Sequence, residues 1–510
     1  MATIDHHADK AKQQKPRQRR RINWQVRMKP LVLALYAGLA GGATVIGLTG
    51  EAQARDGERA PDMVPQRNPS GFAATFSTTG TIDLNNPFFK SLGTNGRSCA
   101  TCHQQGEGWT VTPEGINARF FASQGADPIF RTNDGSNSPN ADVSTVAARF
   151  AAYSMLLNKG LIRVGIGIPA NAEFELVKAD DPYGFASARE LSLFRRPLPS
   201  TNLKFLSTVM LDGRETFKDA NSTDCILNTT NCFASIHFDL AHQSNSATVG
   251  HAQAAQPLTQ EQREAIVSFE TSLFTAQIFD DDAKRLTAHG AKGGPKHASR
   301  LPFYFGINDV VDGDYRTHAP FDPNVFKLYS AWQRAHVGRE ADDDERAERS
   351  VVSARLAVAR GEALFNTHPI TITGVKGIND DLHVPVFHGN CTTCHDTPGA
   401  GNHSIPAPLD IGLTDATRRT ADMPLYTLRN VQTGEVIQTT DPGRALITGK
   451  WRDIGRFKGP ILRALAARAP YFHNGLAADL NAAVDFYNER FGIGFTSEEK
   501  ADLVAFLKTL

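Results

Sequence analysis

The spacing of apolar and polar residues predicts helices more clearly than strands. In residues 258–277 and 353–367, apolar side chains recur at intervals of three and four, which is the repeat of an α-helix with one buried face. The segment 496–510 has the same repeat, and Thr496 followed by Glu499 is a capping-box pattern at its start. Alternating patterns typical of half-buried strands are scarce.

Other stretches lack a helical repeat. Residues 55–80 are polar and without periodicity, which predicts an extended arm. The charge run 342–350 predicts a solvated linker face before the next helix.

The N-terminal segment has the order of an export signal. Residues 1–54 contain nine basic and three acidic side chains, a net charge of +6. The basic block precedes an uncharged stretch, 30–50, and the small residues Ala52 and Ala54. We expect a cleaved signal peptide; a span of this length also permits an uncleaved anchor. The run Arg19–Arg21 is interpreted as part of an ordinary basic start rather than a twin-arginine signal.

Composition narrows the class of protein. The chain has 510 residues, 41% of them hydrophobic, and equal numbers of basic and acidic side chains. This composition excludes a disordered chain and a nucleic-acid binder with a basic surface. No segment after the N-terminal one approaches 18 uninterrupted apolar residues, so we expect the rest to lie in a Gram-negative periplasm.

Cysteine is rare, and its six residues fall into three close pairs. Residues 99–103 read CATCH and residues 391–395 read CTTCH. Cys-x-x-Cys-His is the pattern that attaches a c-type haem. One helical turn between the cysteines lets both sulfurs reach the vinyl groups of one porphyrin, and the adjacent histidine places a nitrogen beneath the iron. The sequence therefore predicts two covalently attached haem c groups.

The two motifs define the predicted attachment residues. The tethering cysteines and iron-binding histidines are Cys99, Cys102 and His103, and Cys391, Cys394 and His395. A redox pair would not require histidine at the next position twice, and a zinc site needs further cysteine ligands. Only Cys225 and Cys232 remain, and in an oxidising compartment they predict a local disulfide.

Around these motifs the sequence resembles the bacterial di-haem cytochrome c peroxidases and the MauG-type di-haem enzymes. Residues 360–368, 391–398 and 453–492 are similar to the second haem domain of that family, and 195–215 is similar to the segment between the haems. The stretch 104–194 looks like an insertion, as does the loop around the predicted disulfide.

The resemblance implies different roles for the two haems. The first is peroxidatic, and the second is six-coordinate and relays electrons. In the family the sixth ligand, Met or Tyr, lies roughly 75–90 residues beyond the second motif. Tyr471 falls in that interval and is the predicted ligand, with His473 and Met423 as alternatives. A tyrosine oxygen is a hard ligand and should lower the reduction potential.

Two departures from the family pattern bear on catalysis. The family commonly has Trp before Asp-Gly-Arg as an electron relay, and here that position is Leu211. Tryptophans that could substitute are Trp109, Trp332 and Trp451. The family's distal pocket also offers a Gln and an acid–base Glu. Gln243 fits the former, but the later stretch has no Glu before Glu261, which is interpreted as helix surface.

For the acid–base role the remaining candidates are His251, Gln253 and Gln256. A distal histidine can move a proton between the peroxide oxygens, so His251 is preferred, with a structural loop histidine as the alternative. The predicted catalytic residues are therefore Gln243 and His251.

Together these observations predict a mainly α protein with two cytochrome c-like haem domains, the first enlarged by a loop-rich insertion. We expect a signal peptide or anchor at 1–54, the peroxidatic domain at 55–350 and the electron-transfer domain at 351–510. The resemblance implies that a calcium ion lies between the domains, for which the sequence assigns no ligands.

The expected function is that of a periplasmic di-haem peroxidase. It would reduce H2O2 at the first haem with electrons relayed through the second from a small cytochrome c or cupredoxin. The alternatives are a MauG-like oxidase of a protein side chain and a non-enzymatic di-haem electron-transfer cytochrome. No nucleic-acid partner is expected, and membrane contact is expected only if the N-terminal segment is uncleaved.

Overall fold

The computed structural model describes residues 59–222, 225–226, 231–334 and 343–510. Ala54–Leu510 forms one compact unit. The other unit, Met1–Gln53, lies outside the described residues, and so does the predicted signal or anchor. Across the described ranges no helix is both long and apolar enough to cross a membrane.

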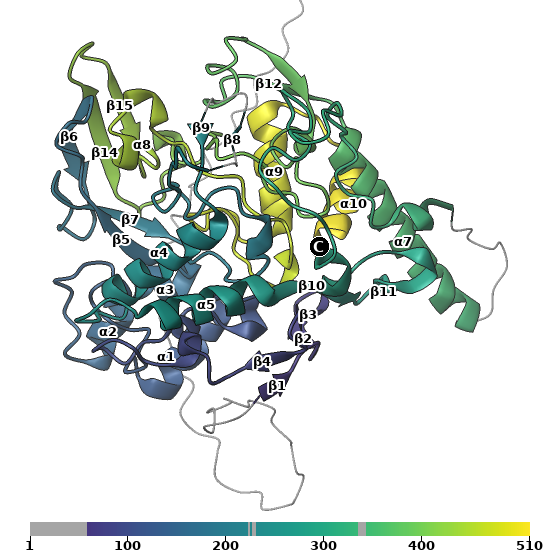
Figure 1. Ribbon diagram of the computed structural model, residues 1–510, viewed down its shortest axis with the longest axis horizontal. Coiled ribbons are helices and arrows are strands. Elements are labelled where there is room, and N and C mark those ends of the chain that lie inside the picture. Colours follow the sequence, from purple (N-terminus) through teal and green to yellow (C-terminus); the bar gives the residue numbers. More distant parts are fainter. Residues whose placement is uncertain (1–58, 223–224, 227–230, 335–342) are drawn as a thin grey trace, which may run out of the picture. The chain divides into compact units, whose positions relative to one another are not determined.

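The described residues contain fifteen β-strands beside ten α-helices, so the prediction of a mainly α protein is wrong (Figure 1). The helices are α1 (Pro113–Ser123), α2 (Val146–Ala152), α3 (Ser154–Lys159), α4 (Ile236–Gly250), α5 (Gln260–Ser272), α6 (Pro295–Ala298), α7 (Asp343–Thr367), α8 (Ala445–Thr448), α9 (Leu480–Phe491) and α10 (Ser497–Lys508). The strands are β1 (Arg59–Pro61), β2 (Gln66–Asn68), β3 (Gly71–Ser77), β4 (Thr81–Asp83), β5 (Ile162–Ile166), β6 (Phe174–Asp180), β7 (Leu191–Arg195), β8 (Cys225–Ile226), β9 (Asn231–Cys232), β10 (Leu273–Asp280), β11 (Lys284–Arg285), β12 (Ile370–Ile372), β13 (Phe387–Gly389), β14 (Leu425–Asn430) and β15 (Val436–Thr439).

Two physical properties hid these strands from the sequence pattern. Many are only two or three residues long, too short to show a repeat. Others are buried on both faces: all five residues of β7 are buried, and β3 and β10 are nearly so. A strand buried on both faces has no alternation of apolar and polar residues.

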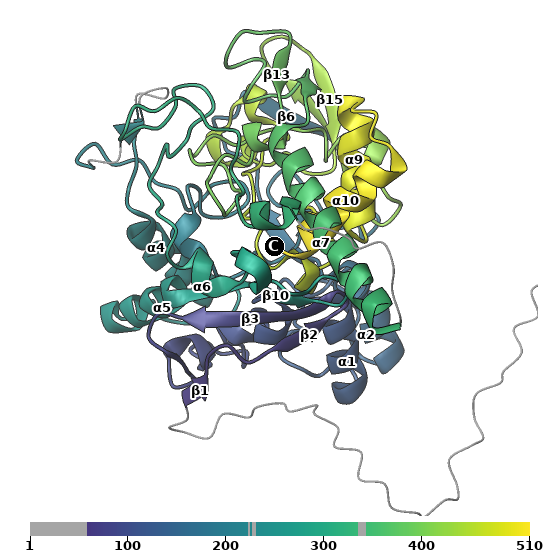
Figure 2. The same cartoon turned by 90° about the vertical axis from the view of Figure 1, so that its right-hand side faces the viewer.

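The sheet ordered β11-β10-β3-β2 supports the first haem motif (Figure 2). β3 lies in the segment predicted as an extended arm and pairs instead with β10 over its whole length. The hydroxyls of Thr75 and Thr275 are 2.9 Å apart across this pair. Thr75 Oγ1 also accepts a hydrogen bond from Trp109 Nε1 at 2.8 Å, which fixes the indole beside His103.

Three predicted helices are present, with changed boundaries. The helix predicted in 258–277 is present as α5 and is capped by Thr259, but it ends at Ser272 and the chain continues as β10. α7 begins at Asp343, so the charge run predicted as a linker face is already helical. The capping box of Thr496 and Glu499 at the start of α10 is confirmed.

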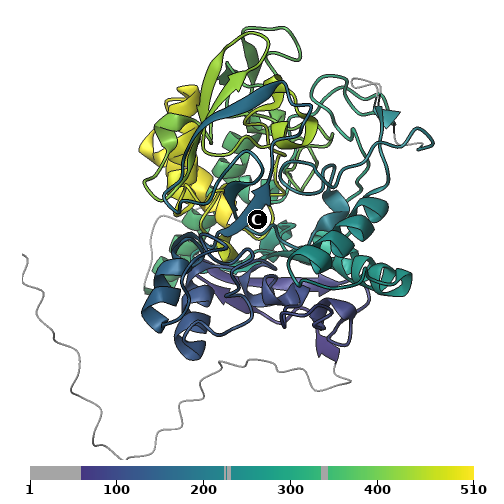
Figure 3. The ribbon, with the colours of Figure 1, turned by 90° about the vertical axis from the view of Figure 1, so that its left-hand side faces the viewer.

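A strand of the predicted insertion joins the C-terminal part of the chain. β6 pairs antiparallel with β14, giving the sheet β15-β14-β6, and Figure 3 shows the blue strand beside the yellow-green ones. Tyr426 of β14 donates its hydroxyl proton to Ser192 O at 2.8 Å and accepts from Ser192 N at 2.9 Å. These bonds anchor β7, which leads directly into the segment between the two haem motifs.

Helices surround the second motif. α7 and α10 pack against each other, and α9 packs against α10. Their apolar side chains form one core cluster that includes Val358, Val484 and Phe506. The same three helices contribute Phe365, Leu480 and Leu503 to the lining of a cavity. The division between two haem domains at residue 350 stays a prediction.

Candidate functional site

The first Cys-x-x-Cys-His motif lines a cavity bounded by α4, α5 and the chain that follows β7. A short 3-10 helix, η2 (Cys99–Thr101), brings Cys99, Cys102 and His103 to the cavity wall. Ser98 N donates to Thr101 Oγ1 at 2.9 Å, which holds the turn that spaces the two cysteines.

The His103 imidazole is held as a neutral ligand. Its Nδ1 lies 3.0 Å from the carbonyl oxygen of Trp109, and because a carbonyl can only accept, Nδ1 carries the proton. Nε2 therefore keeps its lone pair. Burial lowers the pKa of His103 to about 4, so the ring stays uncharged at neutral pH.

The second motif repeats this arrangement in another cavity. The 3-10 helix η7 (Cys391–Thr393) presents Cys391 and Cys394, and His395 follows. His395 Nδ1 donates to Gly401 O at 2.5 Å, and burial again lowers the imidazole pKa to about 4. The duplication seen in the sequence is thus a duplication of local geometry.

The four motif cysteines are not paired with one another as disulfides. Burial raises the pKa of the Cys102 thiol to about 11 and that of Cys394 to about 12. Thiol exchange requires the thiolate, so these thiols are poorly suited to a redox pair. Within the described residues, neither pair has the further His, Cys, Asp or Glu side chains that a zinc site needs. Two protonated thiols and a neutral imidazole at one cavity fit a covalently attached haem.

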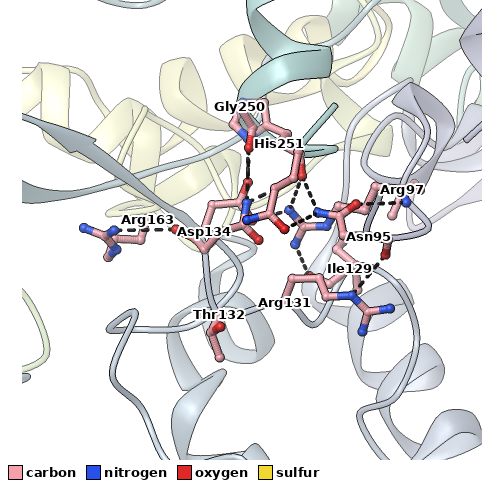
Figure 4. A network of polar contacts seen from close by, with 12 residues as sticks. Asn95, Arg97, Ile129, Arg131, Thr132, Asp134, Arg163, Gly250 and His251 are labelled. Carbon is pink, nitrogen blue, oxygen red and sulfur yellow. Dashed lines mark hydrogen bonds and ion pairs between the residues drawn. The ribbon is translucent and has the colours of Figure 1, made fainter. Parts of the chain in front are cut away.

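His251 lies at the first cavity and is held by a buried carboxylate (Figure 4). Its Nδ1 donates to Asp134 Oδ2 at 2.5 Å, which leaves Nε2 as a proton acceptor. Asp134 also forms an ion pair with Arg97, whose side chain is only 3% exposed. Burial alone would raise the pKa of Asp134, but the hydrogen bonds and charges of His251 and Arg97 outweigh it and lower that pKa.

Backbone contacts fix the position of this histidine further. Asn95 Nδ2 donates to His251 O at 2.8 Å, and Arg97 donates to Ile129 O at 2.6 Å. Asp134 bonds to both Arg97 and His251, and Figure 4 shows these residues gathered in one polar network. The group therefore behaves as one preorganised unit.

Gln243 lies on α4 and lines the same cavity. Gln243, Ala247 and His251 are spaced by four residues, so they share one face of the helix and its cap. Gln253 and Gln256 are not among the residues that line it. The structure thus brings the two predicted catalytic residues to the first haem motif; their roles stay predictions.

Two of the three candidates for the sixth ligand lie at the second cavity, and the third lies elsewhere. Tyr471 and His473 both line the second cavity, whereas Met423 packs in another cluster with Met155 and Phe194. The Tyr471 hydroxyl donates to Leu465 O at 2.9 Å, and burial raises its pKa to about 12. The assignment of Tyr471 as the iron ligand stays a prediction.

His473 is a buried histidine without polar partners. Its ring stacks on Phe457 with centroids 4.1 Å apart, and neither ring nitrogen has a hydrogen bond in the described structure. Burial lowers its pKa to about 4, so it is neutral. An orphaned lone pair at this cavity is a feature that a bound metal would satisfy.

Tyr487, on α9, is a further candidate that the spacing argument missed. It lines the second cavity. Burial raises the pKa of its phenol, and the nearby Cys394 and Cys391 raise it further. It lies 92 residues beyond His395, just outside the interval that singled out Tyr471.

Glu270 of α5 is a second missed residue. It lines the first cavity, is 6% exposed, and its Oε2 has no hydrogen-bond partner in the described part of the chain. Burial raises its pKa to about 8. It lies on the buried face of the helix that begins after Thr259, and only the helical repeat of that segment could have indicated it.

One group of residues lines both cavities, and we call it the shared wall. Its members are Arg196, Pro197, Leu198, Pro199, Leu211, Lys458, Pro460 and Arg468. Leu211 therefore lines both cavities, and its correspondence to the family's electron-relay position stays a prediction. The three tryptophans considered as substitutes line neither cavity.

Two remaining expectations concern bonds away from the cavities. Cys225 and Cys232 form the predicted disulfide, between β8 and β9. Within the described residues no group of three or more His, Cys, Asp or Glu side chains is arranged to hold a metal ion. The implied calcium ion remains without an assigned ligand set.

Comparisons with known proteins agree with this reading of the motifs. No family model matches the chain. Cytochrome-c peroxidase IdrP2 of Denitromonas iodatirespirans is 31% identical over 141 residues, 26% of this chain and 38% of that protein. Cytochrome-c peroxidase IdrP1 of Pseudomonas sp. (strain SCT) is 31% identical over 249 residues, 44% of this chain and 59% of that protein.

A third relative is the cytochrome c551 peroxidase of Nitrosomonas europaea, 31% identical over 24% of this chain and 32% of that protein. The chain thus spans between 32% and 59% of the length of these relatives. Their names confirm the predicted resemblance to bacterial cytochrome c peroxidases. A solved MauG-like protein associated with microbial copper homeostasis is 16% identical, with a TM-score of 0.35, over 88% of this chain and 92% of that one.

Proposed function

We propose that the protein is a periplasmic di-haem peroxidase that reduces H2O2 at the first haem. Each Cys-x-x-Cys-His motif would hold one haem c, and electrons would enter at the second from a small cytochrome c or cupredoxin. The observation that carries the proposal is the difference between the two cavities. Of the two cavities, only the first is lined by a histidine whose ring is held by a buried carboxylate. The second cavity is lined by tyrosines, and a tyrosine oxygen can fill the sixth coordination position of a haem iron.

At the first cavity, the chain supplies proton transfer and orientation. A haem held there by Cys99 and Cys102 would supply the iron at which peroxide binds and is reduced. His251 Nε2 accepts the peroxide proton and returns it to the oxygen that leaves. Asp134 keeps the imidazole in that tautomer, and the Gln243 amide would orient the peroxide by donating a hydrogen bond to it. With two electrons and two protons, each H2O2 yields two waters.

The shared wall supports electron exchange between the two haems. Leu211 and Lys458 belong to both cavity linings, so little protein separates the two sites. Leucine has no redox-active group, and exchange across this wall therefore proceeds without a side-chain radical at Leu211.

A MauG-like oxidase of a protein side chain is the second candidate function. Tyr471 and Tyr487 both line the second cavity, and a tyrosine oxygen on the iron would stabilise its oxidised form. A purely electron-transferring cytochrome, the third possibility, gives no role to the His251–Asp134 pair.

Haem counting and a peroxide assay test the proposal together. We expect two haems per wild-type chain, one in the double variant Cys99→Ala/Cys102→Ala, and one in Cys391→Ala/Cys394→Ala. Peroxide-dependent oxidation of reduced cytochrome c should be lost in both double variants. Turnover that survives removal of the first motif would refute the assignment of the peroxidatic site. Reaction with peroxide but no turnover with any small electron donor would favour the side-chain oxidase.

A further inference from the structure

Several cationic side chains line the two cavities, and three of them, Arg97, Arg195 and Arg214, pair with carboxylates. We call four others the cationic cluster: Arg196, Lys458, Arg463 and Arg468. Three of them, Arg196, Lys458 and Arg468, belong to the shared wall, and Arg463 lines the first cavity. Arg196, Lys458 and Arg463 are 8%, 9% and 2% exposed. Such burial is unusual for charged side chains unless they are paired.

No member of the cationic cluster has an ion-pair partner within the described residues. Lys458 Nζ donates to Thr208 O at 2.9 Å, and Arg468 donates to Ile461 O at 2.6 Å. Arg196 donates to the carbonyl oxygens of Lys159 and Val111. These acceptors are neutral. Asp212 and Glu107 act on Lys458 and Arg196 only through space and form no ion pair with them.

Two members also have unused donors. The Nε atoms of Arg463 and Arg468 are buried and have no hydrogen-bond partner in the described structure. Burial lowers the pKa of both guanidinium groups to about 10 and that of Lys458 to about 7. The cluster is therefore unfavourable as it stands, and a ligand with negative oxygens would relieve it.

The acidic side chains of the first cavity are engaged elsewhere or uncharged. Asp134 pairs with Arg97 and His251. Asp212, which lies near the shared wall, pairs with Arg195 at 2.6 Å. Burial keeps the Glu270 pKa near 8, so it carries little negative charge at neutral pH. Within the described residues, no carboxylate therefore pairs directly with a member of the cationic cluster.

We propose that the cationic cluster binds the propionate carboxylates of both haems, and that Lys458 contacts carboxylates from the two sites at once. This inference rests on the proposed di-haem function. Each haem carries two propionates, so two haems supply four negative charges to four cations. The haem edges then meet at the wall formed around Leu211, whose carbonyl oxygen accepts from Lys458 N at 2.9 Å.

The proposal predicts that Lys458 couples the electrostatics of the two haems. Its positive charge disfavours the more positive, oxidised state of each iron. The variant Lys458→Gln keeps a donor for Thr208 O but loses the charge. We expect both midpoint potentials to fall in a redox titration of the holoprotein. Lys458→Arg should restore both, and Lys450→Gln, at an exposed position, should leave both unchanged.

A second variant keeps the test independent of how well Lys458→Gln folds. Arg468→Gln removes a charge from the same wall and should also lower both potentials. If the variant still carries two haems but only one midpoint potential falls, or neither falls, Lys458 does not contact both haems. That result would leave the proposed function intact. Absence of haem from the wild-type protein would instead refute the proposed function.

Titration with phosphate separates the propionates from a soluble anion. The propionates are held permanently, so wild-type potentials should not respond to phosphate beyond the effect of ionic strength seen with chloride. A specific, saturable shift with phosphate would mean that a soluble anion occupies the cluster, and would contradict the proposal.

Discussion

At the scale of single residues, the chemistry depends on which nitrogen or oxygen is left free. The Nδ1 atoms of His103 and His395 donate hydrogen bonds to the carbonyls of Trp109 and Gly401, so each ring keeps its Nε2 lone pair. The carboxylate of Asp134 accepts the corresponding hydrogen bond from His251 Nδ1. Three histidines are thus set in the same tautomer by three different acceptors.

The pair formed by His251 and Asp134 gives the first prediction. His251→Gln removes the proton acceptor and should lower peroxide turnover by about 10²–10⁴-fold, the usual range for a general base. Asp134→Asn should lower it too, because the imidazole loses its negatively charged partner. His237→Gln, at an exposed position paired with Glu264, serves as the control. Full turnover in His251→Gln would remove this residue from the mechanism.

The ligand of the second iron gives the second prediction. Tyr471→Phe and Tyr487→Phe each remove one hydroxyl from the same cavity. If Tyr471 is the ligand, only Tyr471→Phe should alter the six-coordinate signal in the EPR spectrum of the oxidised protein. A change confined to Tyr487→Phe would transfer the assignment to α9. Unchanged spectra in both variants would leave His473 as the residue to test.

The buried carboxyl of Glu270 gives the third prediction, which concerns stability. Its folded pKa, about 8, lies above its ordinary value of 4.5, so the folded state binds a proton that the unfolded state releases between these values. The free energy of unfolding should therefore fall as pH rises through this window, by up to about 1.4 kcal/mol per pH unit. Denaturant titrations should show a shallower decline in Glu270→Gln. Equal slopes would contradict the raised pKa.

The sequence predicted the attachment residues because they are local: five adjacent positions carry the whole pattern. It could not predict Asp134 as the partner of His251, since the two lie 117 positions apart and only folding brings them together. Tyr487 was missed for a different reason. Its distance along the chain lies just outside the expected interval, although it lines the same cavity as Tyr471.

At the scale of elements, helices with caps were predictable and strands were not. α5 and α10 begin within the segments whose apolar repeat predicted helices, and the capping box predicted for α10 is present. The end of α5 was not predictable, because β10 continues the same apolar run after Ser272 and its burial leaves no alternation. Regular structure in short buried strands is set by tertiary contacts rather than by local pattern.

The contact between α7 and α10 gives the fourth prediction. A Cβ added to Gly361 would overlap the carbonyl oxygen of Asp502, so the two helices approach closely only because this residue is glycine. Gly361→Ala should destabilise the fold by about 1–3 kcal/mol, the usual cost of overpacking. Denaturant unfolding measures this effect. Gly250→Ala, whose Cβ meets no atom within 4 Å, is the control.

The test compares the free energies of unfolding of these two variants. Gly250→Ala should change stability little, because its Cβ enters open space at a helical position. If Gly361→Ala were as stable as the control, the close approach of α7 and α10 would be wrong.

At the scale of the whole molecule, segments distant in sequence build each site. The first cavity combines residues from the N-terminal motif, α4, α5 and the segment around Lys458. The inserted strand β6 pairs with β14, more than 240 positions further along the chain. Such long-range pairings leave no periodic signal, which is why the sequence located two haem motifs but not the wall between their cavities.

Electron paramagnetic resonance of the purified holoprotein can decide whether this protein is a di-haem peroxidase. Spectra are recorded for the oxidised and half-reduced forms, with and without H2O2. We expect two haem signals, one of them six-coordinate in both forms and the other changed by peroxide. If both irons remain low-spin in every state and peroxide alters neither signal, the protein is not a peroxidase.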